Sequence, residues 1–186
     1  MDNGKAKTYT EALQALIGNH FKGFHKYKFQ SGQDFRDRHV WNLEIDDLMK
    51  SNLDSIKKLY TFFLSADMID PITNKAYTVL TLPQCQEIGP HLDLTLEQVS
   101  EAYSYCKMIL VDELKDYGEY KKLKIVEFCD LIVRLADTRF KSEAGLNFLD
   151  KVEKTMDILF KLINCERVKG IFDIEVSSES DYDSDE

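Results

Sequence analysis

Apolar residues recur at a spacing of about 3.6 residues from Glu44 onward, and no long stretch alternates with a period of two. In residues 44–66 the apolar positions form one wide face of a helix. In residues 124–140 they cover more than half of the helix circumference. The pattern therefore predicts an all-α fold in which the helix at 124–140 is central and buried.

Local start and stop signals predict three further helices in this region. Thr81 is the expected N-cap of a helix at 80–89. Pro83 lies in its first turn, where proline is tolerated, and Gly89 is its expected end. Thr95 and Gln98 have the spacing of a capping box. The helix that they open should extend to about residue 114, and a last helix is expected at 144–164.

The N-terminal region, residues 1–43, is expected to hold a short helix at 9–18, with Thr10 as its N-cap and Gly18 as its end. The following stretch, 20-HFKGFHKYKF-29, mixes basic and aromatic residues. We interpret it as an arm packed across the helical body. The alternatives are a contact with an acidic protein surface and, because aromatic rings stack on bases, a nucleic-acid platform.

Composition and apolar run length exclude several protein classes. The chain has 186 residues, of which 44% are hydrophobic and 31% are charged, as in soluble globular proteins. No apolar run approaches the roughly 18 residues that a membrane-spanning helix needs, and the first residues lack the apolar stretch of a signal peptide. We therefore expect no membrane partner and a location in the cytoplasm or a compartment continuous with it.

Acidic residues are concentrated at the C-terminal end. Residues 171–186 contain seven of them and no basic residue, which accounts for most of the net charge of −9. We expect residues 141–168 to form a helix that packs on the domain, and 169–186 to be a disordered acidic tail. The tail disfavours nucleic-acid binding. Ser178 and Ser180 each precede an acidic residue by three positions, so they are candidate phosphorylation sites; otherwise the tail only aids solubility.

The reactive side chains do not form a recognisable catalytic or metal-binding pattern. The cysteines are far apart and lie beside aliphatic residues, so we expect reduced, mostly buried thiols: Cys85, Cys106, Cys129 and Cys165. The histidines lack the spacing of a metal site on a helix: His20, His25, His39 and His91. We accordingly predict no catalytic residue, no cofactor and no enzymatic activity. An enzyme on a helical fold is a third, less favoured class.

Residues 116–127 fit the frame of a calcium-binding helix–loop–helix unit, the EF-hand, but lack most of its ligands. Such a loop has oxygen ligands at positions 1, 3, 5 and 12 and glycine at position 6. With Asp116 at position 1 and Glu127 at position 12, positions 3, 5 and 6 hold Gly118, Tyr120 and Lys121. Leu123 stands at position 8, where an aliphatic residue lets two loops pair.

The same frame fits a stretch about 43 residues upstream, which indicates a weak internal repeat. With Leu80 at position 8, this loop runs from Thr73 to Gln84 and has no negatively charged ligand. We therefore expect residues 44–140 to form a paired, degenerate EF-hand-like domain. An unrelated helical bundle is the alternative, since chance spacing can produce the same repeat.

Calcium binding is a second functional hypothesis rather than a firm site. Asp116 and Glu127 are the charged residues at expected ligand positions, and a calcium ion needs six or more oxygens. The alternative to a metal-free protein is a calcium sensor with one unorthodox site, on which five carboxylates converge: Asp112, Glu113, Asp116, Glu119 and Glu127.

Three segments between Trp41 and Phe140 carry a likeness to a known family: 48-LMKSNLDSIKKLY-60, 94-LTLEQVSEAYSYCKM-108 and 123-LKIVEFCDLIVRLADTRF-140. This region, a little over half of the chain, resembles degenerate calmodulin-like proteins of cilia and flagella, notably those of protists. The resemblance implies a paired EF-hand-like fold without catalysis. It also implies a structural or docking role on microtubules, with axonemal or tubulin-associated proteins as partners and the ciliary axoneme as location.

Two hands that pack face to face can leave a groove for a partner's amphipathic helix. The residues that we expect to line it are apolar, and each is otherwise a core residue: Phe62, Phe63, Ile88, Tyr103, Met108, Phe128 and Ile132. Without calcium such a groove would not be switched by the ion. The expected function is therefore a non-catalytic structural or interaction protein, bound constitutively in an axonemal complex.

Overall fold

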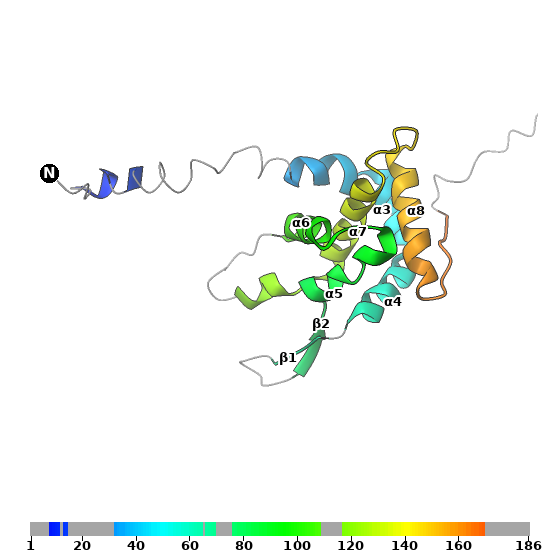
Figure 1. The fold of residues 1–186 in the computed structure, drawn as a ribbon, viewed down its shortest axis with the longest axis horizontal. Coiled ribbons are helices and arrows are strands. Elements are labelled where there is room, and N and C mark those ends of the chain that lie inside the picture. The colour runs from blue at the N-terminus through cyan, green and yellow to red at the C-terminus, as the bar shows by residue number, and fades with distance from the viewer. Residues whose placement is uncertain are drawn as a thin grey trace, which may run out of the picture.

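Helices make up most of the described chain (Figure 1), which confirms the predicted helical class. The computed structural model describes residues 8–11, 13–14, 32–64, 66–69, 76–108 and 117–169. The helices from α3 to α8 contribute to a single apolar core. No helix in the described ranges is long and apolar enough to cross a membrane.

The predicted helix at 44–66 is instead two helices, α3 (Leu43–Ser51) and α4 (Leu53–Phe63). The break is at Asn52, whose backbone leaves the helical region with ψ at 11°. Its buried side-chain amide donates to the carbonyl of Leu48 at 2.9 Å and to that of Val168 at 2.7 Å. Apolar periodicity continues through this break because both helices bury the same face, so the sequence pattern did not reveal it.

After α4 the chain forms a small hairpin that periodicity did not predict. Strand β1 (Ala66–Ile69) pairs antiparallel with β2 (Ala76–Val79), and Ala66 lies opposite Val79. Each strand is four residues long, which is too short for a period of two to stand out. Immediately after β2, Leu80 forms an isolated antiparallel bridge with Leu123.

The predicted caps after the hairpin are present, although two helices end earlier than expected. Thr81 is the N-cap of α5 (Leu82–Gln86), and a 3₁₀ turn, η2 (Gly89–Leu92), follows. The Thr95–Gln98 capping box opens α6: the Thr95 N–H donates to Gln98 Oε1 at 2.8 Å. Helix α6 (Leu96–Cys106) ends well before residue 114 because Lys107 adopts an extended backbone.

The two C-terminal helices build the centre of the fold. Helix α7 (Ile125–Arg139) is buried over most of its length, as predicted for 124–140, and a short 3₁₀ turn, η3 (Tyr117–Lys121), precedes it. Helix α8 (Phe148–Lys161) packs along α7 (Figure 1). It starts later than the predicted residue 144 because Asn147 is its N-cap, accepting from the Asp150 N–H at 2.7 Å.

The segment at 32–40 is also helical and ends in a π-helical turn, η1 (Arg36–Val40), which packs on α7. Farther upstream, residues 9–11 and 13–14 are helical. Thr8, rather than the predicted Thr10, caps this turn, because its Oγ1 accepts from the Glu11 N–H at 3.2 Å. The predicted stop at Gly18 and the arm at 20–29 lie outside the described residues.

Candidate functional site

The two predicted loop frames meet at a backbone bridge. The Leu123 N–H donates to the Leu80 carbonyl at 2.7 Å, and these are the residues that the frames place at position 8. Tyr60 of α4 joins this contact, because its hydroxyl donates to the Leu123 carbonyl at 2.6 Å. Its ring meets that of Phe128 edge-on, with centroids 5.5 Å apart. The bridge thus joins the two loop frames, and the Tyr60 hydrogen bond connects α4 to the second of them.

Each bridge residue is followed by the same kind of helix start. In the first unit, Thr81 is the N-cap and its N–H donates to Oε1 of Gln84 at 3.1 Å. In the second, Lys124 is the N-cap and its N–H donates to Oε2 of Glu127 at 2.8 Å. Positions 8, 9 and 12 of the two frames therefore have equivalent roles in the structure.

Glu127, the predicted calcium ligand at position 12, is buried and engaged by protein groups. Its Oε1 accepts from the Met108 N–H at 2.9 Å. Its Oε2 accepts from the Lys107 ammonium at 2.6 Å, in addition to the Lys124 N–H. The second predicted ligand, Asp116, lies outside the described residues, as do Asp112 and Glu113.

Glu119 does not join Glu127 in the described structure. Its carboxylate pairs with Lys122 at 2.5 Å and with Lys124 at 3.8 Å. The hydrogen bond from Lys122 is the main reason that the pKa of Glu119 is lowered from its usual value. Within the described ranges, no group of three or more histidine, cysteine or acidic side chains is arranged to hold a metal ion.

The thiols of the core are protonated rather than poised for attack. Burial raises the pKa of Cys85 to about 12 and that of Cys129 to about 11, and it also raises the pKa of Cys106. A nucleophilic cysteine needs the opposite shift, because the thiolate is the reactive form. His39 stacks on Phe148 with ring centroids 4.2 Å apart, and burial lowers its pKa.

Most of the predicted groove residues lie in the core. Five are buried, which fits the alternative that they are core residues: Phe63, Ile88, Tyr103, Phe128 and Ile132. Met108 is half-buried beside Glu127. Phe62 differs from these six because its side chain is 56% exposed. The structure therefore places these five residues in the core, and a groove lined by them stays a prediction.

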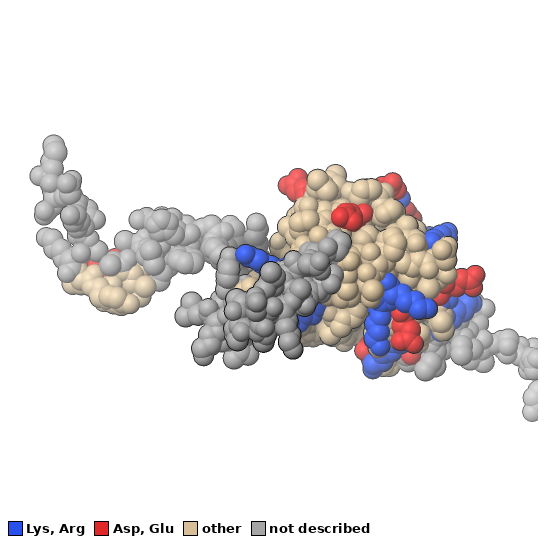
Figure 2. Space-filling model, turned by 90° about the horizontal axis from the view of Figure 1, so that it is seen from below, with Lys and Arg blue, Asp and Glu red and all other residues tan. Residues whose placement is uncertain are grey.

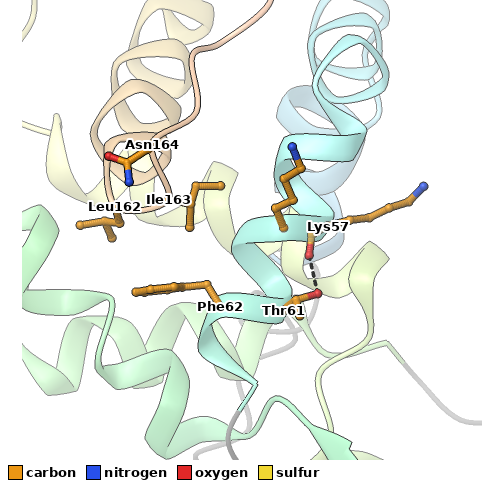
Figure 3. A pocket seen from close by; sticks show the side chains of 7 residues that line it. Lys57, Thr61, Phe62, Leu162, Ile163 and Asn164 are labelled. Carbon is orange, nitrogen blue, oxygen red and sulfur yellow. Dashed lines mark hydrogen bonds between the residues drawn. The ribbon is translucent and has the colours of Figure 1, made fainter.

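Phe62 lies instead in an open hollow between α4 and the turn after α8, with a volume of about 610 Å³. In Figure 3 the ring of Phe62 extends beneath Leu162 and Ile163. The lining combines apolar side chains with two lysines: Lys57, Lys58, Thr61, Phe62, Leu162, Ile163 and Asn164. The Lys57 ammonium is 3.6 Å from Asp54, and both side chains are exposed.

Charged side chains of both signs gather on the side of the molecule where α4 and α8 lie, whereas the rest of this face is mainly uncharged (Figure 2). On this face there is no broad basic surface among the described residues. A nucleic-acid interface needs clustered lysines and arginines to neutralise phosphates. The candidate phosphorylation sites, Ser178 and Ser180, lie outside the described residues.

Sequence reasoning missed the partner of Glu127. Lys107 follows α6 directly, but it is 20 residues from Glu127, and no motif joins the two. The available signal was a lysine next to the end of a helix, where the dipole favours a cation.

No protein-family model, no curated protein and no solved structure matches this chain.

Proposed function

We propose that this chain is a non-catalytic interaction protein that binds a partner protein constitutively. The observation that carries the proposal is the bridge between Leu80 and Leu123, because it joins the two loop frames at their equivalent positions. The matched helix starts at Thr81 and Lys124 add support for a degenerate EF-hand-like pair over an unrelated bundle. Two such units can bind an amphipathic helix of a partner through an apolar surface.

A binding role fits the chemistry of the described residues better than catalysis does. The raised pKa values of Cys85, Cys106 and Cys129 remove the thiols as nucleophiles at neutral pH. The carboxylate of Glu127 is held by a lysine and two backbone N–H groups, so it has no spare role as a general base. These residues stabilise the fold.

The hollow around Phe62 is the docking surface in this proposal. Its occupant is a helical segment of a partner protein with an apolar face and acidic residues beside it. Phe62, Leu162 and Ile163 supply the apolar contact. Lys57 and Lys58 are exposed at the same hollow and supply the complementary charge. Rim charges of this kind favour encounter and specificity more than affinity.

The proposed location is the axoneme of a cilium or flagellum, in a microtubule-associated complex. This part of the proposal follows from the resemblance of the three segments between Trp41 and Phe140. Constitutive docking suits a permanent structural component, because such a component needs no ion to remain bound.

A photo-cross-linking experiment in the native cell tests both parts. A photoreactive phenylalanine analogue at position 62 should give an adduct with one partner in salt-washed axonemes. Charge reversal of Lys57 and Lys58 to glutamate should abolish this adduct. The matched control places the analogue at Leu96, a similarly exposed apolar residue at the start of α6, where no adduct is expected.

Three results would contradict the proposal. Recovery of the protein in the soluble fraction, with none in the axonemes, contradicts the location. Equal adducts at positions 62 and 96 contradict the docking surface. An intramolecular adduct between position 62 and the acidic tail identifies the tail, instead of a partner, as the occupant of the hollow.

A further inference from the structure

We propose that the ammonium group of Lys107 is the built-in cation of the second loop, holding Glu127 in the way that calcium holds it in an active hand. The inference rests on the proposed function, because it explains how an EF-hand-like unit keeps its shape without the ion. It assigns Lys107 a positioning role at this site.

The contacts of Lys107 coincide with calcium-ligand positions of the loop frame. In a calcium-binding loop, position 7 contributes a backbone carbonyl and position 12 a glutamate side chain. Here these positions are Lys122 and Glu127. The Lys107 ammonium donates to the Lys122 carbonyl oxygen and to Oε2 of Glu127. One ammonium group therefore contacts two of the oxygens that a calcium ion would use.

Burial makes the Lys107–Glu127 pair costly to separate. The side chains of Lys107 and Glu127 are 11% and 3% exposed, and their charged atoms are 2.6 Å apart. A calcium ion at Glu127 would have to displace the ammonium and leave it without its counter-charge. Removing one partner of a buried ion pair is strongly unfavourable. Lys107 also lies just past the C-terminus of α6, where the helix dipole favours a positive charge.

Position 12 of the first loop frame needs no cation because its residue is uncharged. This residue is Gln84, whose amide oxygen accepts from the Thr81 N–H. The corresponding glutamate oxygen in the second loop accepts from the Lys124 N–H and, in addition, from the Lys107 ammonium. The additional donor, Lys107, is thus found at the frame whose position 12 carries a negative charge. Position 12 of each frame therefore has its polar partners within the protein, although the two frames achieve this through different residues.

A double-mutant cycle on the full chain measures the pairing. The variants are Lys107→Met, Glu127→Gln and the two together, with unfolding equilibria measured in urea. The expected coupling is about tenfold or more in the unfolding equilibrium constant, because the ions are buried and adjacent. The matched control is the Lys50–Asp46 pair, which is similarly short at 2.5 Å but exposed. Lys50→Met with Asp46→Asn should couple by only about twofold.

Calcium titration then tests the cation position directly. Calcium should not change the Tm of the native chain or of the double variant, but it should raise the Tm of Lys107→Met by several degrees. This rise requires Glu127, because calcium can bind its carboxylate only when the Lys107 ammonium is absent. Lys107→Arg, which keeps the charge, should remain unresponsive to calcium.

Several outcomes overturn the inference. One is a coupling between Lys107 and Glu127 no larger than that of the exposed pair. Another is a Lys107→Met variant whose Tm does not change with calcium. The third is calcium binding by the native chain that Glu127→Gln abolishes. If Lys107→Met fails to fold, folding of the double variant supports the inference, since no unpaired buried charge remains; failure of both overturns it. Loss of the cross-link at Phe62 with intact coupling contradicts the proposed docking surface and leaves the cation assignment standing.

Discussion

The guanidinium group of Arg36 donates through Nε to Oδ2 of Asp130 at 2.8 Å, and this contact fastens the helical segment before α3 to the middle of α7. Asp130 is buried and has a second partner, since Arg134 Nε donates to its Oδ1 at 2.7 Å. The two arginines also reach backbone carbonyls: Arg36 those of Tyr105 and Lys107, and Arg134 that of Gly32. One carboxylate therefore organises the junction of three segments.

Replacing Asp130 with Asn should destabilise the fold by about 3 kcal/mol or more, because two partly or fully buried arginines lose their counter-charge. Urea denaturation followed by circular dichroism measures this loss. Asp46→Asn is the matched control, since its partner Lys50 is exposed, and it should cost under about 1 kcal/mol. Similar losses for the two variants would refute the central role of Asp130.

Asn52→Ala should loosen the chain after α8. Asn52 exchanges two hydrogen bonds with the backbone of Val168, at 2.7 and 2.6 Å, and each is worth about 1 kcal/mol. Hydrogen exchange of the Val168 amide should become markedly faster in the variant. Val168→Ala keeps both backbone bonds and removes a mainly exposed side chain, so it should retain the protection. Unchanged exchange in Asn52→Ala would contradict this attachment.

Gly89→Ala should destabilise the protein by about 1–3 kcal/mol, through overpacking. A Cβ at this position would lie 2.9 Å from the Leu94 carbonyl oxygen and 3.2 Å from Val99 Cγ2. Gly145→Ala is the matched control, because nothing lies within 4 Å of its added Cβ. Thermal unfolding should show a lower Tm for the first variant and little change for the second. Equal Tm values would show that η2 can move away from Leu94.

The buried thiols should make the protein sensitive to alkali. Burial raises the pKa of Cys85 to about 12 and of Cys129 to about 11, from an ordinary value near 9. The folded state then holds these protons more tightly than the unfolded state, so stability is full below about pH 9 and decreases as pH rises toward 12.

Urea unfolding at pH 7, 9 and 10.5 measures this decrease. A Cys85→Ala variant should lose less stability over the same range, and a thiol reagent at pH 8 should label Cys85, Cys106 and Cys129 slowly until urea is added. Rapid labelling of these three thiols in the folded protein would contradict the assignment.

Local signals predicted the parts of the fold that depend on neighbouring residues. Thr81 and the Thr95–Gln98 box start their helices as expected, and the apolar circumference of 124–140 marked α7 as central. The frame that aligned Leu80 with Leu123 identified two residues that the structure pairs. The hairpin was missed, because four-residue strands leave no clear period.

The candidate site was predicted less well, because the apolar residues of a helix do not reveal which of them the fold covers. Phe62 and Phe63 are adjacent and equally apolar, yet one is exposed in the hollow and the other is core. Successive positions on a helix point about 100° apart, and the packing of α4 against its neighbours selects which of them is covered. A groove could therefore not be separated from the core by sequence alone.

By itself the sequence determined the helical class and the helix starts at Thr81 and Thr95, because each depends on residues a few positions apart. Only the tertiary structure decided which charges meet. Lys107 pairs with Glu127 across 20 residues, Arg36 with Asp130 across 94, and Asn52 with Val168 across 116. Such pairs have no local spacing rule. They form because buried ions and amides need partners, and the packed helices determine which partners are within reach.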